Sequence, residues 1–270
     1  MNLSENLDNL LASAGSYFAG EAEVVRTYWD WSGRTIETDL RWLELQVFKE
    51  FKGSGVGEFQ NKGVILGPLI EVQELLPKMD RGVDRHRIRD LLEGLYEEFT
   101  HLVAFADVYD AIRPEGTPSI DPHRCEGWTE DDVLTQLRYK TIAENGEIGR
   151  RASKFTEGGY CTLFREGMAI AGRGGNERLI ANACRLVYED EFEHMLEGVV
   201  GLDDAKHASE DWQRMSDLVV SLLQARIAMR NGQFSYPLTA DRIAAITAGD
   251  IEPITFDFET ASRLIAERKA

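Results

Sequence analysis

Apolar residues recur at helical spacing through long stretches of this 270-residue chain, and only seven prolines interrupt it. Such periodicity is typical of amphipathic α-helices, which turn one apolar stripe towards a core. The pattern therefore predicts an all-α protein. The length allows one large domain or two small ones, and no low-complexity tract or linker divides the chain. We expect a single helical domain over residues 1–270.

The helices are bounded by capping and turn residues. Asp84 is the expected N-cap of the segment over 84–112, and Pro114 lies just past the end of that segment. Thr129 begins another segment, which has acids in its first turn. Asn145–Gly146 predicts a bend, and the glycines at 172–175 predict a turn between helices. The expected segments cover residues 35–52, 68–79, 84–112, 129–171, 176–200 and 209–231, with one or two short helices in the tail.

The charge disfavours some classes of partner, and the cysteine content indicates the compartment. A formal net charge of −17 repels nucleic-acid phosphates and anionic membranes, so we expect neither as a partner. Three cysteines without a CxxC motif fit a reducing cytoplasm better than a disulfide framework. The first residues have no basic region typical of a signal peptide, and no apolar run approaches the roughly 18 residues of a membrane span. We expect a cytoplasmic protein.

Two Glu-x-x-His motifs fall on predicted helices. Glu98 precedes His101, and Glu191 precedes His194. Residues three apart share a helix face, so each pair can direct a carboxylate and an imidazole at one point. Carboxylate oxygen with imidazole nitrogen is a ligand set suited to iron or manganese. Both pairs fall on the apolar, core-facing stripe of their segment, where a glutamate requires a cation or a strong donor.

Two further glutamates occupy similar stripes. Glu157 shares a helix face with apolar and small residues. If the segments 129–171 and 176–200 are antiparallel, the short turn at 172–175 would bring Glu157 level with Glu191. In the first segment, Glu44 shares a face with Leu40, Val47 and Phe51, so it is the predicted ligand there. The other glutamates that this segment and the short helix after it offer are Glu37, Glu71 and Glu74.

The order Glu, Glu-x-x-His, Glu, Glu-x-x-His resembles the ferritin-like di-iron carboxylate superfamily. The resemblance covers residues 35–200 and implies a four-helix bundle, with accessory helices over 209–270. It implies two iron ions (Fe²⁺/Fe³⁺), or manganese in place of iron, and dioxygen activation by a non-heme di-iron oxygenase or oxidase. It also implies a small organic substrate, an electron-donor protein and a monomer or homodimer. The implied metal ligands are Glu44, Glu98, His101, Glu157, Glu191 and His194.

Three other interpretations stay open from the sequence. One is a ferritin-like or rubrerythrin-like protein that handles iron or peroxide, although a rubredoxin-like CxxC module is absent. A second is a heme-oxygenase-like di-metal oxidase, compatible with the four-residue spacings Glu97–His101 and Asp190–His194. The third is an acidic helical scaffold without a metal. The segment between Glu44 and Glu98 is about twenty residues longer than a bundle hairpin needs, which departs from the superfamily pattern.

Glycines near the predicted ligands bear on the choice between these functions. A glycine inside a helix costs roughly 1 kcal/mol relative to alanine. Gly94, Gly158, Gly159 and Gly198 therefore indicate space kept either for close helix packing or for a substrate. Cys161 and Cys184 fall one turn from predicted ligands, where they are core residues or line a pocket. The substrate, and whether oxygen is inserted into it, do not follow from the sequence.

Overall fold

The computed structural model describes residues 4–53, 62–156, 160–204 and 207–255 of the chain. Within these ranges all regular structure is helical, which confirms the all-α prediction. The chain divides into two compact units. Unit 1 combines Met1–Arg34 with Thr129–Ala270, and unit 2 is Thr35–Trp128. The predicted bundle core of residues 35–200 takes in all of unit 2 and part of unit 1, and the single-domain interpretation stays a prediction.

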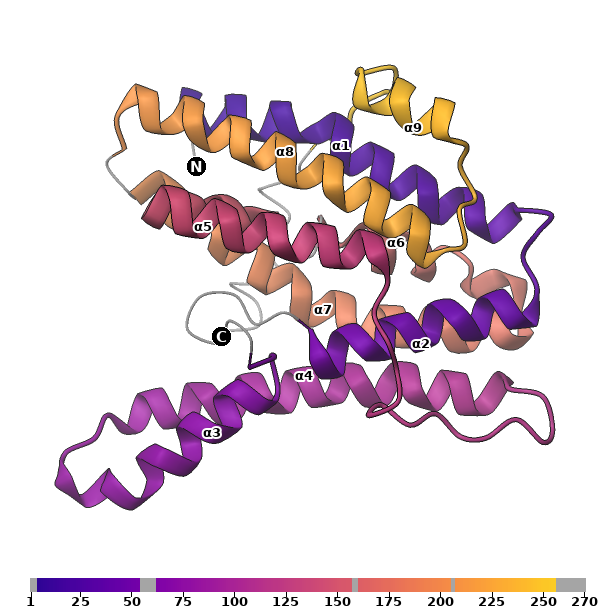
Figure 1. The fold of residues 1–270 in the computed structure, drawn as a ribbon, viewed down its shortest axis with the longest axis horizontal. Helices are drawn as coiled ribbons and strands as arrows, with labels where there is room; N and C mark the ends of the chain where they lie inside the picture. Colours follow the sequence, from indigo (N-terminus) through magenta and orange to yellow (C-terminus); the bar gives the residue numbers. More distant parts are fainter. Residues whose placement is uncertain (1–3, 54–61, 157–159, 205–206, 256–270) are drawn as a thin grey trace. The chain divides into compact units, whose positions relative to one another are not determined.

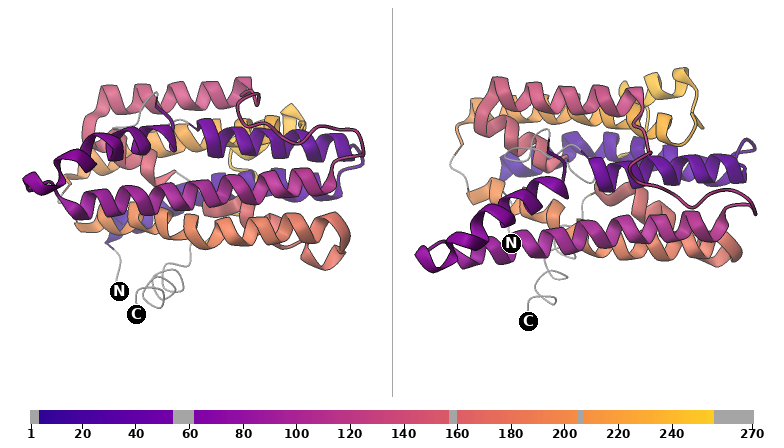
Figure 2. Two further views of the ribbon diagram at one scale, coloured as in Figure 1. Left: turned by 90° about the horizontal axis from the view of Figure 1, so that it is seen from below. Right: turned by 60° about the horizontal axis from the view of Figure 1, so that its bottom comes forward.

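Unit 2 is built on two long helices, α2 (Ile36–Lys52) and α4 (Arg85–Ile112), which lie side by side (Figures 1 and 2). Thr35 caps α2 in a capping box, and the side chain of Asp84 caps α4 by accepting a hydrogen bond from the backbone N–H of His86. Between them, α3 (Leu66–Leu75) packs on α4, and the 3₁₀-helix η2 (Leu76–Arg81) follows. These two elements account for the extra length before Glu98.

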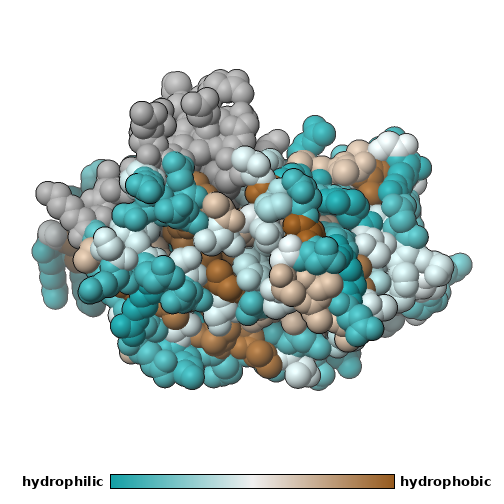
Figure 3. All heavy atoms as spheres, turned by 90° about the horizontal axis from the view of Figure 1, so that it is seen from above, coloured by the Kyte–Doolittle hydropathy of each residue, from teal (hydrophilic) through white to brown (hydrophobic). Residues whose placement is uncertain are grey.

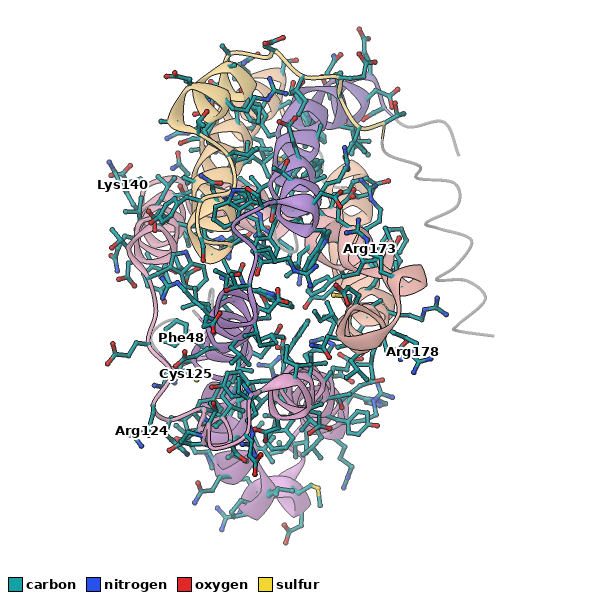
Figure 4. The ribbon with its side chains drawn as sticks, turned by 90° about the vertical axis from the view of Figure 1, so that its right-hand side faces the viewer. Phe48, Arg124, Cys125, Lys140, Arg173 and Arg178 are labelled. Carbon is teal, nitrogen blue, oxygen red and sulfur yellow. The ribbon has the colours of Figure 1, made fainter. Side chains whose placement is uncertain are left out.

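The loop after α4 returns to α2 and closes unit 2. Lys52 Nζ donates hydrogen bonds of 2.8 Å to the carbonyl oxygens of His123 and Cys125. A Cβ at Gly127 would lie 3.0 Å from the ring of Phe48, so glycine allows the loop to approach the helix this closely. In Figure 4 the labelled Cys125 lies beside Phe48. The loop thereby fixes the C-terminal half of α2, which carries Glu50.

In unit 1, too, the regular structure of the described residues is all helical. Its core pairs α1 (Glu5–Asp30) with α8 (Ser209–Gln233), and α5 (Thr129–Phe155) also packs on α8 (Figure 1). The remaining elements are α6 (Thr162–Met168), the 3₁₀-helix η4 (Ala171–Arg173), α7 (Gly175–Asp204) and α9 (Ala240–Thr247). The predicted bend in α5 is present at Gly146, whose φ of 53° is outside the helical range.

Helix α1 was not predicted from the sequence. Many of its buried positions are alanine or glycine, including Ala14, Gly15 and Ala19, and such small residues weaken the apolar stripe by which a helix is recognised. Gly20 is required for packing, because a Cβ there would lie 2.5 Å from Ile246 Cγ2 and 2.9 Å from Ile227 Cδ1. The small residues of α1 thus allow this helix to pack closely in the core of unit 1.

A buried ion cluster joins α1 to α8 inside unit 1. The carboxylate of Glu21, 1% exposed, accepts hydrogen bonds of 2.9–3.0 Å from the guanidinium groups of Arg226 and Arg230. Burial alone would raise the pKa of Glu21, but the two arginines outweigh burial and lower it. Burial lowers the pKa of Arg230. Glu21 is therefore held as a carboxylate in the core.

Hydrophilic side chains predominate on the molecular face in Figure 3, and hydrophobic ones form small areas between them. This agrees with the acidic composition, since charged residues keep such a surface hydrated. None of the helices in the described ranges has the length and apolar character needed to cross a membrane.

Candidate metal centre

Three acidic and imidazole side chains meet inside unit 2. Glu50 comes from α2, and Glu98 and His101 come from α4. One carboxylate oxygen of each glutamate and one imidazole nitrogen all lie within 4.8 Å of one another. Glu50 is 7% exposed and His101 is completely buried, while Glu98 is half-buried. We call these three residues the Glu50 triad.

The buried face of α2 brings Glu50 to this position. Leu43 and Val47 are fully buried, and Glu50 follows Val47 by three residues on the same face. Gln46, one turn before Glu50, donates a hydrogen bond of 2.5 Å from Nε2 to Glu50 Oε1. This bond fixes the direction of one carboxylate oxygen. A glutamate at this position is therefore held in the core rather than extended into solvent.

Helix α4 positions the other two members of the triad. Phe105 is fully buried four residues after His101, and it packs edge-on against Trp42 of α2 with ring centroids 6.1 Å apart. This contact, with the buried Leu102 next to His101, sets which face of α4 meets α2. Glu98 lies three residues before His101 on that face. The Glu-x-x-His spacing thus brings both ligand atoms to one point.

The donor atoms fit a metal ion. Two ligand atoms that bind one ion at about 2.1 Å lie no more than about 4.2 Å apart, so small side-chain rotations would close the triad around a cation. Two buried or half-buried carboxylates at this distance repel each other, and a cation removes that repulsion. Two oxygens and one imidazole nitrogen suit iron or manganese and leave coordination positions open. The triad can therefore hold a divalent ion.

The structure does not bring Glu44 together with Glu98 and His101. Glu44 is exposed on α2, away from the face of Leu43 and Val47. The predicted stripe used Leu40 and Phe51, which are only half-buried, and missed Trp42 and Leu43 as the deepest residues. Glu50 is six positions after Glu44, so the two lie about 120° apart around the helix. In the triad, α2 contributes Glu50 and not Glu44.

The other glutamates considered for this position also lie elsewhere. Glu37 and Glu74 are exposed. Glu71 forms a two-bond ion pair with Arg87, at 2.8 and 3.0 Å. Of the two spacings that end at His101, the triad contains Glu98 and not Glu97.

The remaining predicted ligands belong to unit 1. Glu157 is outside the described residues, and His194 lies on α7 but its side chain is outside them. Glu191 is half-buried on α7, and its charge adds to the effect of burial in raising the pKa of the Cys161 thiol well above its usual value. Cys161 is fully buried and precedes the first residue of α6, with a φ of 51°. Glu191 and Cys161 are therefore neighbours within unit 1.

Glu50 could have been found in the sequence from a different choice of stripe. Leu43, Val47 and position 50 follow the i, i+4, i+7 spacing of one helix face, and Trp42 next to Leu43 adds a large apolar side chain. Extending that face by one turn reaches Glu50.

Searches of protein-family models, curated proteins and solved structures found nothing that matches this chain.

Proposed function

We propose that this protein is a non-heme di-iron oxygenase or oxidase that oxidises a small organic substrate with dioxygen. The observation that carries the proposal is the Glu50 triad, a buried group of two carboxylates and one imidazole with ligand atoms within 4.8 Å of one another. Its Glu-x-x-His pair on α4 is one half of the ligand pattern of the ferritin-like di-iron carboxylate superfamily.

A di-iron centre needs a second set of ligands. The sequence provides one at Glu157, Glu191 and His194, with the same Glu-x-x-His spacing. By the resemblance, these three residues would hold the second metal, and the Glu50 triad would hold the first. The assignment of the second set rests on the sequence pattern and on the resemblance, and it replaces Glu44 by Glu50 in the predicted set of six.

The residues of the triad have separate tasks. The carboxylates of Glu50 and Glu98 offset the charge of the metal, and His101 adds a neutral nitrogen donor. Gln46 orients Glu50 through its 2.5 Å hydrogen bond, as residues around a metal site commonly do for its ligands. Two ferrous ions would supply two electrons to dioxygen, and the substrate or an added reductant would supply the other two. Burial of His101 and Glu50 limits access of water.

Two observations bear on the substrate. The net charge of −17 disfavours phosphate-rich molecules and suits a small neutral or cationic compound. Gly94 lies one turn before Glu98 on the same side of α4, and a Cβ there would have no neighbour within 4 Å. Open space at this glycine is consistent with room for a small molecule next to the triad.

Metal analysis after anaerobic loading with ferrous iron tests the ligand assignment. We expect two ions per chain, since the six residues form two sets. The variants His101→Ala and His194→Ala should each lower the content to one ion or fewer, because each removes a ligand. His86→Ala, which changes an exposed histidine at the start of α4, is the matched control and should retain two. A wild-type content near zero would support the acidic scaffold and end the proposal.

Oxygen uptake separates an oxygenase from an iron store. The ferrous-loaded protein should consume dioxygen in proportion to its two ions, and turnover should continue only with a reductant or an oxidisable substrate. Glu98→Ala should abolish this uptake. A large hollow oligomer that accumulates hundreds of ferric ions would instead support the ferritin-like alternative.

A further inference from the structure

Helix α4 carries two apolar faces. One is buried inside unit 2 and includes Leu91, Leu102 and Phe105. The other consists of four large side chains that are between 42% and 74% exposed: Leu92, Tyr96, Phe99 and Val103. We call these four residues the outer stripe. A surface helix needs one apolar face to join its own core, and a second exposed one marks an interaction surface.

The outer stripe is regular. Its residues follow one another at intervals of four, three and four, which places them in one line along a helix of 3.6 residues per turn. Val103 is about 200° around the helix from His101, so the stripe points away from the Glu50 triad. This is the spacing by which two helices pack side by side over several turns. The geometry therefore fits a helix as the partner.

Charged residues of opposite sign lie at the two ends of the stripe. Arg85 and Arg89 precede it by one or two turns, and Asp107 and Asp110 follow it. All four are exposed. At 100° per residue these side chains lie on or next to the line of the stripe. Along the line of the outer stripe, arginines therefore stand at one end and aspartates at the other.

We propose that the outer stripe is a self-association surface, on which α4 of a second copy packs antiparallel about a two-fold axis. With the axis between Glu97 and Glu98, Leu92 of one copy meets Val103 of the other, and Tyr96 meets Phe99. The same axis sets Arg85 opposite Asp110 and brings Arg89 next to Asp107. A two-fold interface requires such self-complementarity, and one helix here supplies both halves of it.

Charge decides between the two directions of packing. Parallel helices would place the arginines of one copy against those of the other, which is unfavourable, whereas antiparallel helices pair every arginine with an aspartate. Two of these residues already have local contacts: Arg89 with Asp90 at 2.7 Å, and Asp110 with Arg113 and the backbone N–H of Ile120, each at 3.1 Å. The contact of Arg89 is exposed, so the arginine can exchange it for a partner across the interface.

A second copy fits this surface better than an unrelated protein does. The net charge of −17 makes two chains repel at long range, so association needs local pairs of opposite charge. The outer stripe has arginines at one end and aspartates at the other, so an antiparallel second copy would match each charge with its opposite. Tyr96 and Phe99 at its centre are aromatic residues, which are enriched in the cores of interfaces.

Analytical ultracentrifugation of the full-length chain tests the proposal. We expect the wild type to sediment with twice the mass of 30.4 kDa for one chain. Phe99→Asp should weaken dimerisation by at least about tenfold, because it places a charge in the centre of the stripe. Val133→Asp, at an exposed apolar residue of α5 in unit 1, is the matched control and should leave the dimer unchanged. Circular dichroism verifies that each variant keeps its helices.

Charge reversal tests the antiparallel register. Arg89→Glu and Asp107→Lys should each weaken the dimer, and the double variant should restore it, since the two positions face each other across the axis. Cysteine cross-linking gives a second readout. An oxidised mixture of Leu92→Cys and Val103→Cys chains should yield a disulfide-linked pair, and Leu92→Cys alone should not. The three native cysteines are buried and leave this readout clear.

Three outcomes would overturn the proposal. A wild-type chain that stays monomeric at high concentration has no such interface. A dimer that Phe99→Asp does not affect uses another surface. Cross-linking of Leu92→Cys only with itself would place the helices parallel and reject the antiparallel arrangement.

Discussion

A carboxylate oxygen of Glu50 on α2 lies within 4.8 Å of an imidazole nitrogen of His101 on α4. This relationship joins two helices that are far apart in the sequence, and it makes the carboxylate of α2 a metal-ligand candidate. Gln46 supports it from the preceding turn of α2. Glu50 and His101 are both buried, so the contact between them belongs to the core of unit 2 rather than to its surface.

The first prediction separates Glu50 from Glu44. Glu50→Ala should lower the iron content by one ion per chain, because it removes a ligand from a buried site. Glu44→Ala, on the same helix but exposed, should leave the content unchanged. Metal analysis of both variants after identical anaerobic loading measures the difference. Loss of iron in Glu44→Ala with retention in Glu50→Ala would restore the ligand predicted from the sequence.

Replacing Glu21 should destabilise unit 1. Glu21→Ala leaves Arg226 and Arg230 buried without their shared carboxylate, and breaking a buried pair by removing one partner costs about 3–5 kcal/mol. Denaturation by urea measures the loss. Glu23→Ala breaks the more exposed pair with Arg242 and should have a much smaller effect. Equal effects of the two variants would contradict the role of burial.

The same ion cluster predicts how stability depends on pH. The pKa of Glu21 is lower in the folded protein than its usual value of 4.5. The stabilisation is therefore complete above that value and is lost as the pH falls through the lower, folded pKa. The difference in unfolding free energy between the wild type and Glu21→Gln should shrink only below about pH 4.5. A difference that already falls between pH 7 and pH 5 would exclude Glu21 as its source.

Two glycines should respond to alanine in opposite directions. A Cβ at Gly94 meets nothing within 4 Å, so Gly94→Ala should stabilise α4 by about 1 kcal/mol through helix propensity. A Cβ at Gly167 would lie 2.4 Å from Cys184 Sγ, so Gly167→Ala should cost about 1–3 kcal/mol. Thermal unfolding of both variants gives the signs. A loss of stability in Gly94→Ala would show that its space is filled.

The cysteines should be unreactive in the folded protein. Burial raises the pKa of Cys125 to about 11 and that of Cys184 to about 12, so both stay protonated near neutral pH. Cys161 is also fully buried. A thiol reagent such as Ellman's should react slowly with the native chain and with all three thiols after unfolding in guanidinium. Rapid labelling of the native chain would contradict this burial.

The sequence predicts the helices better than it predicts their faces. Asp84 caps α4 as expected, because capping depends on nearby residues in the chain. Which face of α2 is buried depends instead on Trp42 meeting Phe105 of α4, a contact between distant residues. A shift of about 120° around α2 exchanges Glu44 for Glu50. The Glu-x-x-His pair could be predicted without knowing any contact between helices, since both of its residues lie on one helix.

Unit 2 is an insertion in the sequence of unit 1, and this order governs how the chain is made. Glu21 on α1 leaves the ribosome 205 residues ahead of Arg226, which belongs to the helix that completes its ion cluster. At about 5–20 residues per second, this interval lasts roughly 10–40 seconds. All of unit 2 is synthesised during this interval, so α2 and α4 can assemble before α8, the partner of α1, has been synthesised. Nascent α1 is thus the segment that chaperones would have to shield.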